Sequence, residues 1–261
     1  MAEREDQRVA ITTITLGQVR IEHETAMLNH VYPIGRRFER VMIIGQSILD
    51  ARNLAMWMAE KNDWSFVFFW DDDIVPQTPA AFGLIMAGFD ALPQADVIGG
   101  VYPRRGVLTD PIVIKEPGAG VWWGWQHVAC DDHEAHDADC LECRKTALYA
   151  MHKVYMTGTG FMGVRMSSMQ KLDLPTYTVG DRGQNVHGVK RYFDNTINAR
   201  SDDFHFADLC LLNDLNWYVA GGAVCDQIEL DGTIYRIQDA IPKVVEEKKN
   251  GRRKKVTLVK A

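Results

Sequence analysis

Apolar residues in the first hundred positions alternate between short unbroken runs and stretches with helical spacing. The unbroken runs, rich in β-branched and aromatic residues, predict strands at 9–15, 38–44, 65–70 and 96–102. The stretches between them predict helices at 18–30, 49–61 and 79 to about 91. We expect Thr78 to be the N-cap of the third helix and Pro79 to occupy its first turn. Alternating strands and helices predict an α/β fold whose central sheet is mostly parallel and flanked by helices.

The second half of the chain has a less regular pattern. We expect short strands over residues 111–127, and strands interrupted by three glycines over residues 147–165. Residues 201–216 predict a further helix, whereas residues 127–145 are polar and rich in cysteine. The chain shows no internal repeat.

The composition is that of an ordinary globular protein. The 261 residues suffice for one large domain with a sizeable core. Hydrophobic residues make up 46% and charged residues 25%, which is typical of soluble globular proteins. No apolar run approaches the ~20 residues of a membrane-spanning helix, and the first residues lack the apolar core of a signal peptide. We therefore expect a protein without a membrane span, located in the cytoplasm.

Charge is distributed unevenly along the chain. The net charge is −6, but from Lys243 onward eight basic residues oppose two acidic ones, so that segment carries +6 and residues 1–242 carry −12. We therefore divide the chain into one domain over residues 1–242 and a basic C-terminal tail over residues 243–261. Basic tails can bind nucleic acid, and the alternative is a solvated tail without a partner.

Three consecutive aspartates follow the most apolar of the predicted strands. Ligands of such sheets bind beyond the carboxyl ends of the strands. Along an extended chain Asp71 and Asp73 would point the same way and Asp72 would point elsewhere. Two neighbouring carboxylates suit a hard cation such as Mg²⁺ or Mn²⁺, which can bridge to phosphates. Asp72 could then contact a ribose or sugar hydroxyl. The alternative is a solvated acidic turn.

Five motifs follow one another in a fixed order: Ala-Arg-Asn (51–53), Phe-Phe-Trp-Asp-Asp-Asp-Ile-Val-Pro (68–76), Val-Ile-Gly-Gly-Val-Tyr-Pro-Arg-Arg (97–105), Gly-Thr-Gly-Phe-Met-Gly-Val-Arg (158–165) and Ser-Asp-Asp-Phe-His-Phe (201–206). In this order the sequence resembles glycosyltransferases of the A-type fold, especially those encoded by bacteriophages, over roughly residues 9–230. The resemblance implies a single nucleotide-sugar-binding domain. Residues 1–105 would form its nucleotide-sugar-binding half and residues 106–242 its acceptor half.

The resemblance also implies a donor and a cofactor. The donor would be a nucleotide-diphosphate sugar, with a UDP-sugar as the first choice, and the Asp-x-Asp pair would bind Mn²⁺ or Mg²⁺ to stabilise charge on the leaving group. Arg52, Asn53 and Thr15 would contact the nucleotide, with a surface salt bridge as the alternative for Arg52. Gly158 and Gly160 would let the backbone approach the donor sugar or acceptor, with a bulged strand as the alternative.

The acidic pair in the last motif resembles the one that supplies the catalytic base of inverting members. Such a base takes a proton from the acceptor hydroxyl as that hydroxyl attacks the anomeric carbon. We expect Asp203 to fill this role, with Asp202 as the second choice. Ser201 and Asp202 also suit the N-cap of a helix, and the two roles are compatible.

One departure from the family concerns the third protein ligand of the cation. Many relatives place a histidine shortly after the last motif, where this chain has Ala-Val-Cys-Asp-Gln-Ile-Glu (223–229). Asp226 or Gln227 would have to substitute for it. Otherwise the Asp-x-Asp pair, phosphates and water would complete the coordination.

The cysteine-rich segment has the spacing of a zinc site. The five cysteines of the chain are an odd number, which argues against a disulfide framework in the cytoplasm. Four ligands in two close pairs suit a tetrahedral structural Zn²⁺, which would order a zinc-binding insertion over residues 127–145. The expected ligands are Cys130, His133, Cys140 and Cys143, with His136 and His127 as alternatives to His133. The alternative is a mobile acidic loop with free thiols.

These expectations combine into a metal-dependent, inverting glycosyltransferase that moves a hexose to a hydroxyl. The expected acceptor is 5-hydroxymethyl-pyrimidine in phage DNA within the host cytoplasm, because the basic tail favours DNA. Trp122, Trp123 and Trp125 could stack on the acceptor or belong to the core. The alternatives are a cell-surface glycan or lipid-linked precursor as acceptor, and a non-catalytic sugar- or nucleic-acid-binding module with the same fold.

Overall fold

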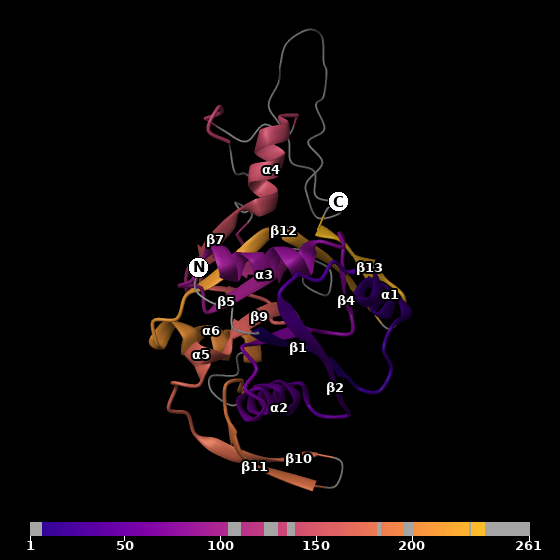
Figure 1. Ribbon diagram of the computed structural model, residues 1–261, viewed down its shortest axis with the longest axis vertical. Helices are drawn as coiled ribbons and strands as arrows, with labels where there is room; N and C mark the ends of the chain where they lie inside the picture. The colour runs from indigo at the N-terminus through magenta and orange to yellow at the C-terminus, as the bar shows by residue number, and fades with distance from the viewer. Residues whose placement is uncertain are drawn as a thin grey trace.

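The computed structural model describes residues 7–103, 111–122, 130–134, 139–181, 184–195, 201–229 and 231–237 (Figure 1). Its main sheet has the strand order β13-β12-β5-β9-β3-β1-β2. These strands are β1 (Gln7–Thr15), β2 (Arg36–Ile44), β3 (Phe66–Trp70), β5 (Val97–Val101), β9 (Phe161–Arg165), β12 (Trp217–Ile228) and β13 (Ile234–Tyr235). Strands β2, β1, β3, β5 and β12 run in one direction, and β9 runs antiparallel between β3 and β5. The mixed α/β fold with a mostly parallel sheet is confirmed.

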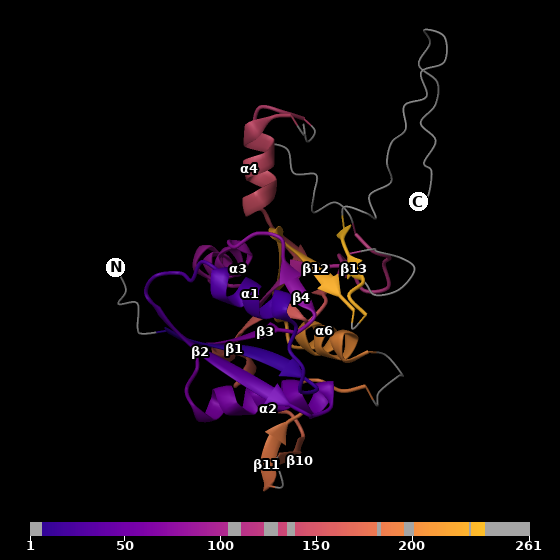
Figure 2. The same cartoon turned by 90° about the vertical axis from the view of Figure 1, so that its right-hand side faces the viewer.

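Helices cover both faces of this sheet. They are α1 (Ile21–Asn29), α2 (Ile48–Lys61), α3 (Ala81–Ala91), α4 (Leu141–Tyr149), α5 (Met166–Met169) and α6 (Asp202–Leu212). Figure 2 shows α1 and α3 on one side of β1, β2 and β3, and α2 on the other. Residues of α2, α5 and α6 contribute to one apolar cluster, and residues of α1 and α3 contribute to a second.

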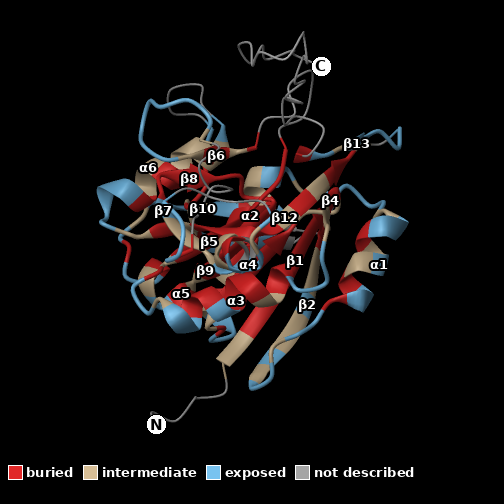
Figure 3. Cartoon of the chain, turned by 90° about the horizontal axis from the view of Figure 1, so that it is seen from above, coloured by how far each residue is buried: buried red, intermediate tan, exposed pale blue. Residues whose placement is uncertain are grey.

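Strand β3 separates the two clusters, and all of its residues are buried. In Figure 3 buried positions gather at the centre of the fold and exposed ones at its periphery. Val67 and Phe69 belong to the cluster with α2, whereas Phe66, Phe68 and Trp70 belong to the cluster with α3. Successive side chains of a strand point to opposite faces, so an unbroken apolar run is what a strand covered on both sides requires. This burial fixes the end of β3, where the three aspartates begin.

Both halves of the chain contribute to the same sheet. Strands β9 and β12, from the second half, pair with β3 and β5 from the first half. Two parts extend from the ends of the molecule in Figure 1: α4 at one end, and the hairpin of β10 (Thr176–Asp181) and β11 (Gln184–Lys190) at the other. None of the helices in the described part of the chain has the length and apolarity that a membrane crossing demands.

The second half differs from its expected pattern. Over residues 111–127 the described residues contain one short strand, β6 (Val113–Ile114), which pairs with β8 (Met156–Thr157). The expected strand region at 147–165 begins inside α4 and continues as β7 (Met151–Val154), β8 and β9. The remaining strand, β4 (Ile74–Pro76), pairs with β12. The basic tail over 243–261 lies outside the described residues.

The prediction for the start of α3 is wrong. The helix begins at Ala81, after an N-cap at Ala80 whose side chain makes no capping bond, so neither Thr78 nor Pro79 has its expected place. Instead the Phe82 N–H in the first turn donates to Nε2 of His30 at 3.0 Å. Nδ1 of His30 lies 3.2 Å from the Ala26 carbonyl, which requires the proton on Nδ1. A histidine from a distant segment therefore satisfies a backbone donor at this helix end.

This histidine should make stability depend on pH. Burial lowers the pKa of His30 below its ordinary value of 6.5. The unfolded chain therefore binds the proton first, so stability is full above 6.5 and is lost as the pH falls toward the folded-state pKa, by at most about 1.4 kcal/mol per pH unit. We expect His30→Asn to flatten this dependence in denaturant unfolding measured across that range. Equal pH slopes for the two proteins would contradict the assignment.

Candidate active site and metal centre

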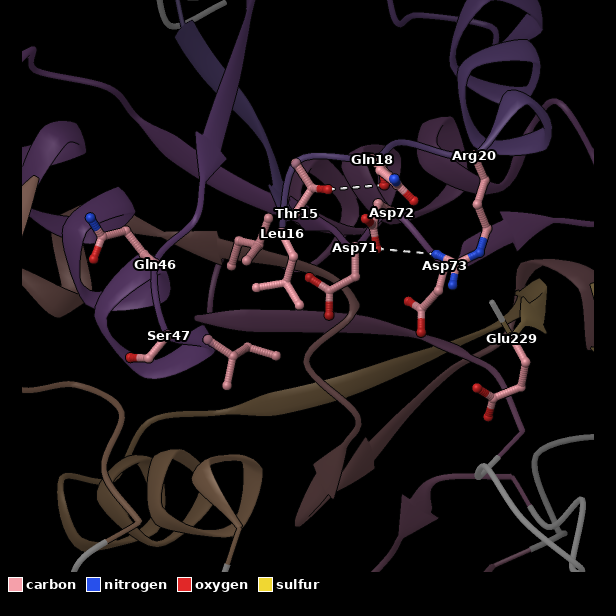
Figure 4. A pocket seen from close by; sticks show the side chains of 12 residues that line it. Thr15, Leu16, Gln18, Arg20, Gln46, Ser47, Asp71, Asp72, Asp73 and Glu229 are labelled. Atoms are coloured by element: carbon pink, nitrogen blue, oxygen red, sulfur yellow. Dashed lines mark hydrogen bonds and ion pairs between the residues drawn. The ribbon is translucent and has the colours of Figure 1, made fainter. Parts of the chain in front are cut away.

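A cavity of about 610 Å³ lies at the carboxyl ends of β1 and β3 (Figure 4). It is lined by Thr15 and Leu16 at the end of β1, by Ser47 at the start of α2 and by residues 71–73 after β3. We call it the β1–α2 pocket. The Thr15 hydroxyl donates to the Gln18 carbonyl and accepts from the Gly17 N–H, which fixes the loop after β1. Because α2 begins at this pocket, the positive end of its dipole favours a negatively charged ligand there.

A second cavity, of about 470 Å³, lies beside the first. It is lined by Tyr102 after β5, by Ile112 and Ile114, and by residues 201–204 at the start of α6; we call it the β5–α6 pocket. Asp71 and Asp73 line both pockets, whereas Asp72 lines only the first. In Figure 4 the side chains of Asp71 and Asp73 point to the same side and Asp72 points away. Two carboxylates therefore stand where the pockets meet.

Asp71 is bonded by one arginine, and one of its two carboxylate oxygens has no hydrogen-bond partner among the described residues. Its Oδ2 accepts from Nη2 of Arg52 at 2.9 Å, and its Oδ1 has no hydrogen-bond partner among the described residues. Burial raises the pKa of Asp71 to about 6, an effect that Arg52 opposes and the neighbouring carboxylates reinforce. A buried acceptor without a partner is costly, so a bound cation would relieve an existing deficit.

Asp73 has a neighbour from β12. Gln227 pairs across the ladder with Ile74, and its Nε2 donates to Oδ2 of Asp73 at 3.0 Å. Asp226 makes its contacts elsewhere, with Gln77 at 2.7 Å and Arg236 at 3.1 Å. Of the two residues that the sequence offered as a third ligand, Gln227 is therefore the one beside the aspartates. Oxygen atoms of this kind fit Mg²⁺ or Mn²⁺.

Asp72 faces the guanidinium of Arg20, a residue that the sequence analysis did not select. Nη1 of Arg20 lies 3.4 Å from Oδ1 of Asp72, inside the β1–α2 pocket (Figure 4). Arg20 is the only basic residue between β1 and α1, and that isolation was the available signal. The pocket thus combines four carboxylates, those of residues 71–73 and Glu229, with one arginine, a set that suits a phosphate group accompanied by a metal cation.

The expected position of Arg52 needs correction. It does not line the β1–α2 pocket, and it is not a surface salt bridge, because its side chain is only 4% exposed. Besides Asp71 it bonds Asp202 through Nη1, which also lies 3.6 Å from Oδ1 of Asp203. Burial lowers the pKa of Arg52, but the three carboxylates more than offset this and raise it. Arg52 therefore joins the end of β3 to the start of α6 in the wall of the β5–α6 pocket.

Asp203 lies in the β5–α6 pocket and accepts a hydrogen bond from the Thr159 hydroxyl at Oδ1. Burial raises the pKa of Asp203, Arg52 opposes this, and Asp202 reinforces it. A carboxylate with a raised pKa that faces a cavity is suited to accept a proton. Ser201 is the N-cap of α6, as the sequence allowed, but its side chain makes no capping bond. Thr159 was not predicted.

The two glycines have a reason that differs from the expected one. The Gly160 N–H donates to the Tyr102 hydroxyl at 2.7 Å. A Cβ on Gly158 would lie 2.1 Å from that hydroxyl, and a Cβ on Gly160 would lie 3.0 Å from Oδ2 of Asp71. The glycines therefore make room for Tyr102 and Asp71. Neither glycine lines the described pockets.

Asn53 also needs correction as a nucleotide contact. Its Oδ1 accepts from the N–H groups of Tyr192 and Phe193, and its Nδ2 donates to the Phe193 carbonyl and the Tyr177 hydroxyl. The side chain is buried and lines neither pocket. Its hydrogen-bonding capacity is used to attach residues 192–193 to α2.

A metal-ligating group lies apart from these pockets, at the start of α4. The ligand atoms of Cys130, His133, Cys140 and Cys143 all lie within 4.8 Å of one another. The Cys130–Cys143 Sγ distance is 3.5 Å and the Cys130 Sγ–His133 Nδ1 distance is 3.2 Å. The backbone N–H groups of Cys130 and Cys143 donate to cysteine sulfurs. This group could hold a metal ion. His127 and His136 lie outside the described residues.

The tryptophans give no support for acceptor stacking. The ring of Trp122 packs edge-on against His152 at 5.2 Å, and Nζ of Lys115 lies 4.9 Å from its centroid. Trp123 and Trp125 lie outside the described residues.

Comparison with known proteins informs the fold alone. No protein-family model matches the chain, and no curated protein matches it. Among solved structures, the chain is similar to the crystal structure of A197 from STIV, with a TM-score of 0.52 and 15% sequence identity. The similarity covers 88% of this chain and 94% of that chain. It agrees with a mixed α/β fold over most of the length.

Proposed function

We propose that the protein is a metal-dependent glycosyltransferase of the A-type fold, acting with a nucleotide-diphosphate sugar. The observation that carries the proposal is the pair of adjoining pockets with Asp71 and Asp73 between them and Asp203 in one of them. A transferase needs a donor site and an acceptor site that meet at the reacting carbon. The motif resemblance in the sequence agrees with this arrangement.

In this proposal the β1–α2 pocket binds the donor. The nucleotide lies near Thr15 and Leu16, Asp72 contacts a sugar or ribose hydroxyl, and Arg20 and the start of α2 face the diphosphate. Asp71 and Asp73 hold Mn²⁺ or Mg²⁺, which neutralises charge on the leaving diphosphate. A UDP-sugar is the first donor to test.

The β5–α6 pocket binds the acceptor in this proposal. Asp203 takes the proton of the acceptor hydroxyl. At the same time the hydroxyl oxygen of the acceptor forms a bond to the anomeric carbon, and the bond from that carbon to the diphosphate breaks. Attack from the side opposite the leaving group inverts the anomeric centre. Thr159 and Arg52 fix the carboxylate in place.

The lining of the β5–α6 pocket restricts the acceptor. Among the described residues that line this pocket, Arg52 is the sole cationic side chain, and its guanidinium is already paired with Asp71 and Asp202. The walls include Ile112, Met156 and Phe204. A neutral group with an apolar face suits such walls, and a flipped 5-hydroxymethyl-pyrimidine base from DNA has that character. We take it as the first acceptor, ahead of a glycan or lipid-linked precursor.

The test is sugar transfer from a panel of nucleotide-sugars with Mn²⁺ to duplex DNA that contains 5-hydroxymethylcytosine or 5-hydroxymethyluracil, read by nucleoside mass spectrometry. A hexose-sized mass gain that EDTA abolishes would support both the activity and the acceptor. Metal-dependent donor hydrolysis without transfer would keep the enzyme class and overturn the DNA acceptor. The absence of both transfer and hydrolysis with every donor would favour a non-catalytic binding module.

We also infer that the Cys130/His133/Cys140/Cys143 group holds a structural Zn²⁺. Three thiolates and one imidazole fill a tetrahedral shell and leave no open position for catalysis. The N–H bonds to sulfur are the outer contacts that orient such ligands. Zinc would attach the segment at residues 130–134 to the first turn of α4.

Cys143→Ser is the variant that tests this inference. Because second-layer changes alone cost 10–100-fold in metal affinity, we expect loss of a buried ligand to weaken zinc binding by more than about 100-fold. Metal content by mass spectrometry and the thiolate-to-metal absorption of the Co²⁺-substituted protein report the result. Cys210→Ala removes another buried thiol outside the group and should leave both unchanged. Full zinc content in the Cys143→Ser protein would refute the site.

A further inference from the structure

The end of β12 is bound tightly to the loop that carries the aspartates. Gln227 and Asp226 pair with Ile74 and Val75 of β4, and the Ile228 N–H donates to the Asp73 carbonyl at 2.8 Å. This backbone pairing places the Gln227 side chain against Asp73 without any contribution from a ligand. Gln227 is 7% exposed and lines the β5–α6 pocket.

The hydrogen bond to Asp73 assigns the nitrogen and the oxygen of the Gln227 side-chain amide. Nε2 donates to Oδ2 of Asp73, because an amide oxygen placed there would face a carboxylate oxygen with no proton between them. The opposite end is therefore Oε1, and it is buried without a hydrogen-bond partner in the described structure. Oδ1 of Asp71 is buried in the same condition. Two oxygen acceptors at one site are thus desolvated and unsatisfied, which is a deficit that a cation removes.

We propose that Oε1 of Gln227 is the third protein ligand of the divalent cation, together with Asp71 and Asp73. This rests on the proposed function, which places the cation on the aspartates, and it adds the identity of the third ligand and its consequence for metal choice. Two carboxylates and one amide oxygen provide only oxygen atoms as protein ligands, and no nitrogen atom. Oxygen sets suit Mg²⁺, Ca²⁺ and Mn²⁺, whereas an imidazole favours Mn²⁺ and the later transition metals over Mg²⁺. The site should therefore accept Mg²⁺ as readily as Mn²⁺.

Asp226 provides the matched control. It precedes Gln227 on the same strand, and it is engaged by Gln77 and Arg236 away from the site. Asp226→Asn removes a formal charge from the same strand, so a purely long-range electrostatic effect on cation binding would appear in it. An effect confined to Gln227 would require a local contact.

The experiment measures cation binding to the full chain, without substrate, after the Cys/His group has been saturated with Zn²⁺. Free Mn²⁺ is followed by electron paramagnetic resonance, and Mg²⁺ affinity is obtained by competition. We expect Gln227→Ala to weaken Mn²⁺ binding by more than about 100-fold, because loss of an outer contact alone costs about 10–100-fold, and Asp226→Asn to leave it unchanged. Gln227→His should raise the preference for Mn²⁺ over Mg²⁺ by about 10-fold. Circular dichroism verifies that each variant is folded.

The outcomes separate this inference from the function on which it rests. If Asp71→Asn abolishes Mn²⁺ binding while Gln227→Ala weakens it by no more than about 100-fold, the scale of losing an outer contact, and Gln227→His keeps the wild-type Mg²⁺/Mn²⁺ ratio, Gln227 at most orients Asp73 and the inference fails alone. If Asp71→Asn also leaves Mn²⁺ binding unchanged, the cation site of the proposed function fails. Should Gln227→Ala not fold, the Gln227→His selectivity decides: an unchanged Mg²⁺/Mn²⁺ ratio overturns the inference.

Discussion

Replacing Asp203 by Asn is expected to lower sugar transfer by about 10²–10⁴-fold, the usual contribution of a general base. The variant keeps the shape of the side chain and its contact with Thr159 but cannot take the proton of the acceptor hydroxyl. Asp203 lines only the β5–α6 pocket, so donor binding should change little. Steady-state transfer and equilibrium binding of the nucleoside diphosphate measure the two effects separately.

Asp208→Asn is the matched control for this prediction. Asp208 lies further along α6, accepts a hydrogen bond from Tyr155 and does not line the described pockets. It should leave transfer within a few-fold of wild type. Transfer at the wild-type rate in Asp203→Asn would refute the assignment, and Asp202→Asn would then be the next variant to measure.

The same residue predicts a pH profile. Burial raises the pKa of Asp203 above its ordinary value, so the carboxyl group keeps its proton to a higher pH than an exposed aspartate does. A protonated Asp203 cannot act as a base. The transfer rate should therefore rise with pH through that raised pKa, and Asp203→Asn should lose this limb of the profile.

The pattern of apolar residues predicted those strands and helices whose own sequence shows which of their faces are buried. The apolar run of β3 requires cover on both faces, and the structure provides it. What the pattern could not give is the neighbour of each strand. Strand β9 lies antiparallel between β3 and β5, although it begins sixty residues after the end of β5 and still further from β3 along the chain. Pairing between distant strands depends on the whole packed sheet, and no short-range period encodes it.

The site shows the same division between local and distant information. Asp71 and Asp73 could be selected because they directly follow a buried strand. The role of Arg52 could not, because its guanidinium joins the carboxylate of Asp71, 19 residues away along the chain, to that of Asp202, 150 residues away. The cap of α3 by His30 is a second case, since a side chain from outside the helix replaced the local Thr-Pro signal. Contacts of this kind arise only when elements pack.

Replacing Arg52 by Met should lower the free energy of unfolding by about 3–5 kcal/mol, the cost of leaving buried charge without its partner. Arg52 is 4% exposed, bonds Asp71 and Asp202, and lies near Asp203. Methionine fills a similar volume, so the loss would report the charge and its hydrogen bonds more than packing. Denaturant unfolding with an unchanged m-value would measure it.

Two comparisons make this prediction specific. Arg40→Met breaks the pair of Arg40 with Glu24, which is partly exposed, and should cost only about 0.2–1 kcal/mol. Arg52→Lys should fall between the two, because one ammonium cannot reproduce a planar fork that bonds two carboxylates. A loss below about 1 kcal/mol in Arg52→Met would show that the carboxylates do not depend on Arg52.

The dependence on pH provides a further check on the cause. Without Arg52, the buried carboxyl groups lose the interaction that favours their charged form, so their pKa values should rise further. A group whose pKa is raised by folding contributes stability that is present at low pH and lost as the pH increases. The deficit of Arg52→Met relative to wild type should therefore be larger at about pH 8 than at about pH 5. A deficit independent of pH would point to packing instead. Arg52 would then be a spacer between β3 and α6, not the counter-charge that lets three aspartates share one buried site.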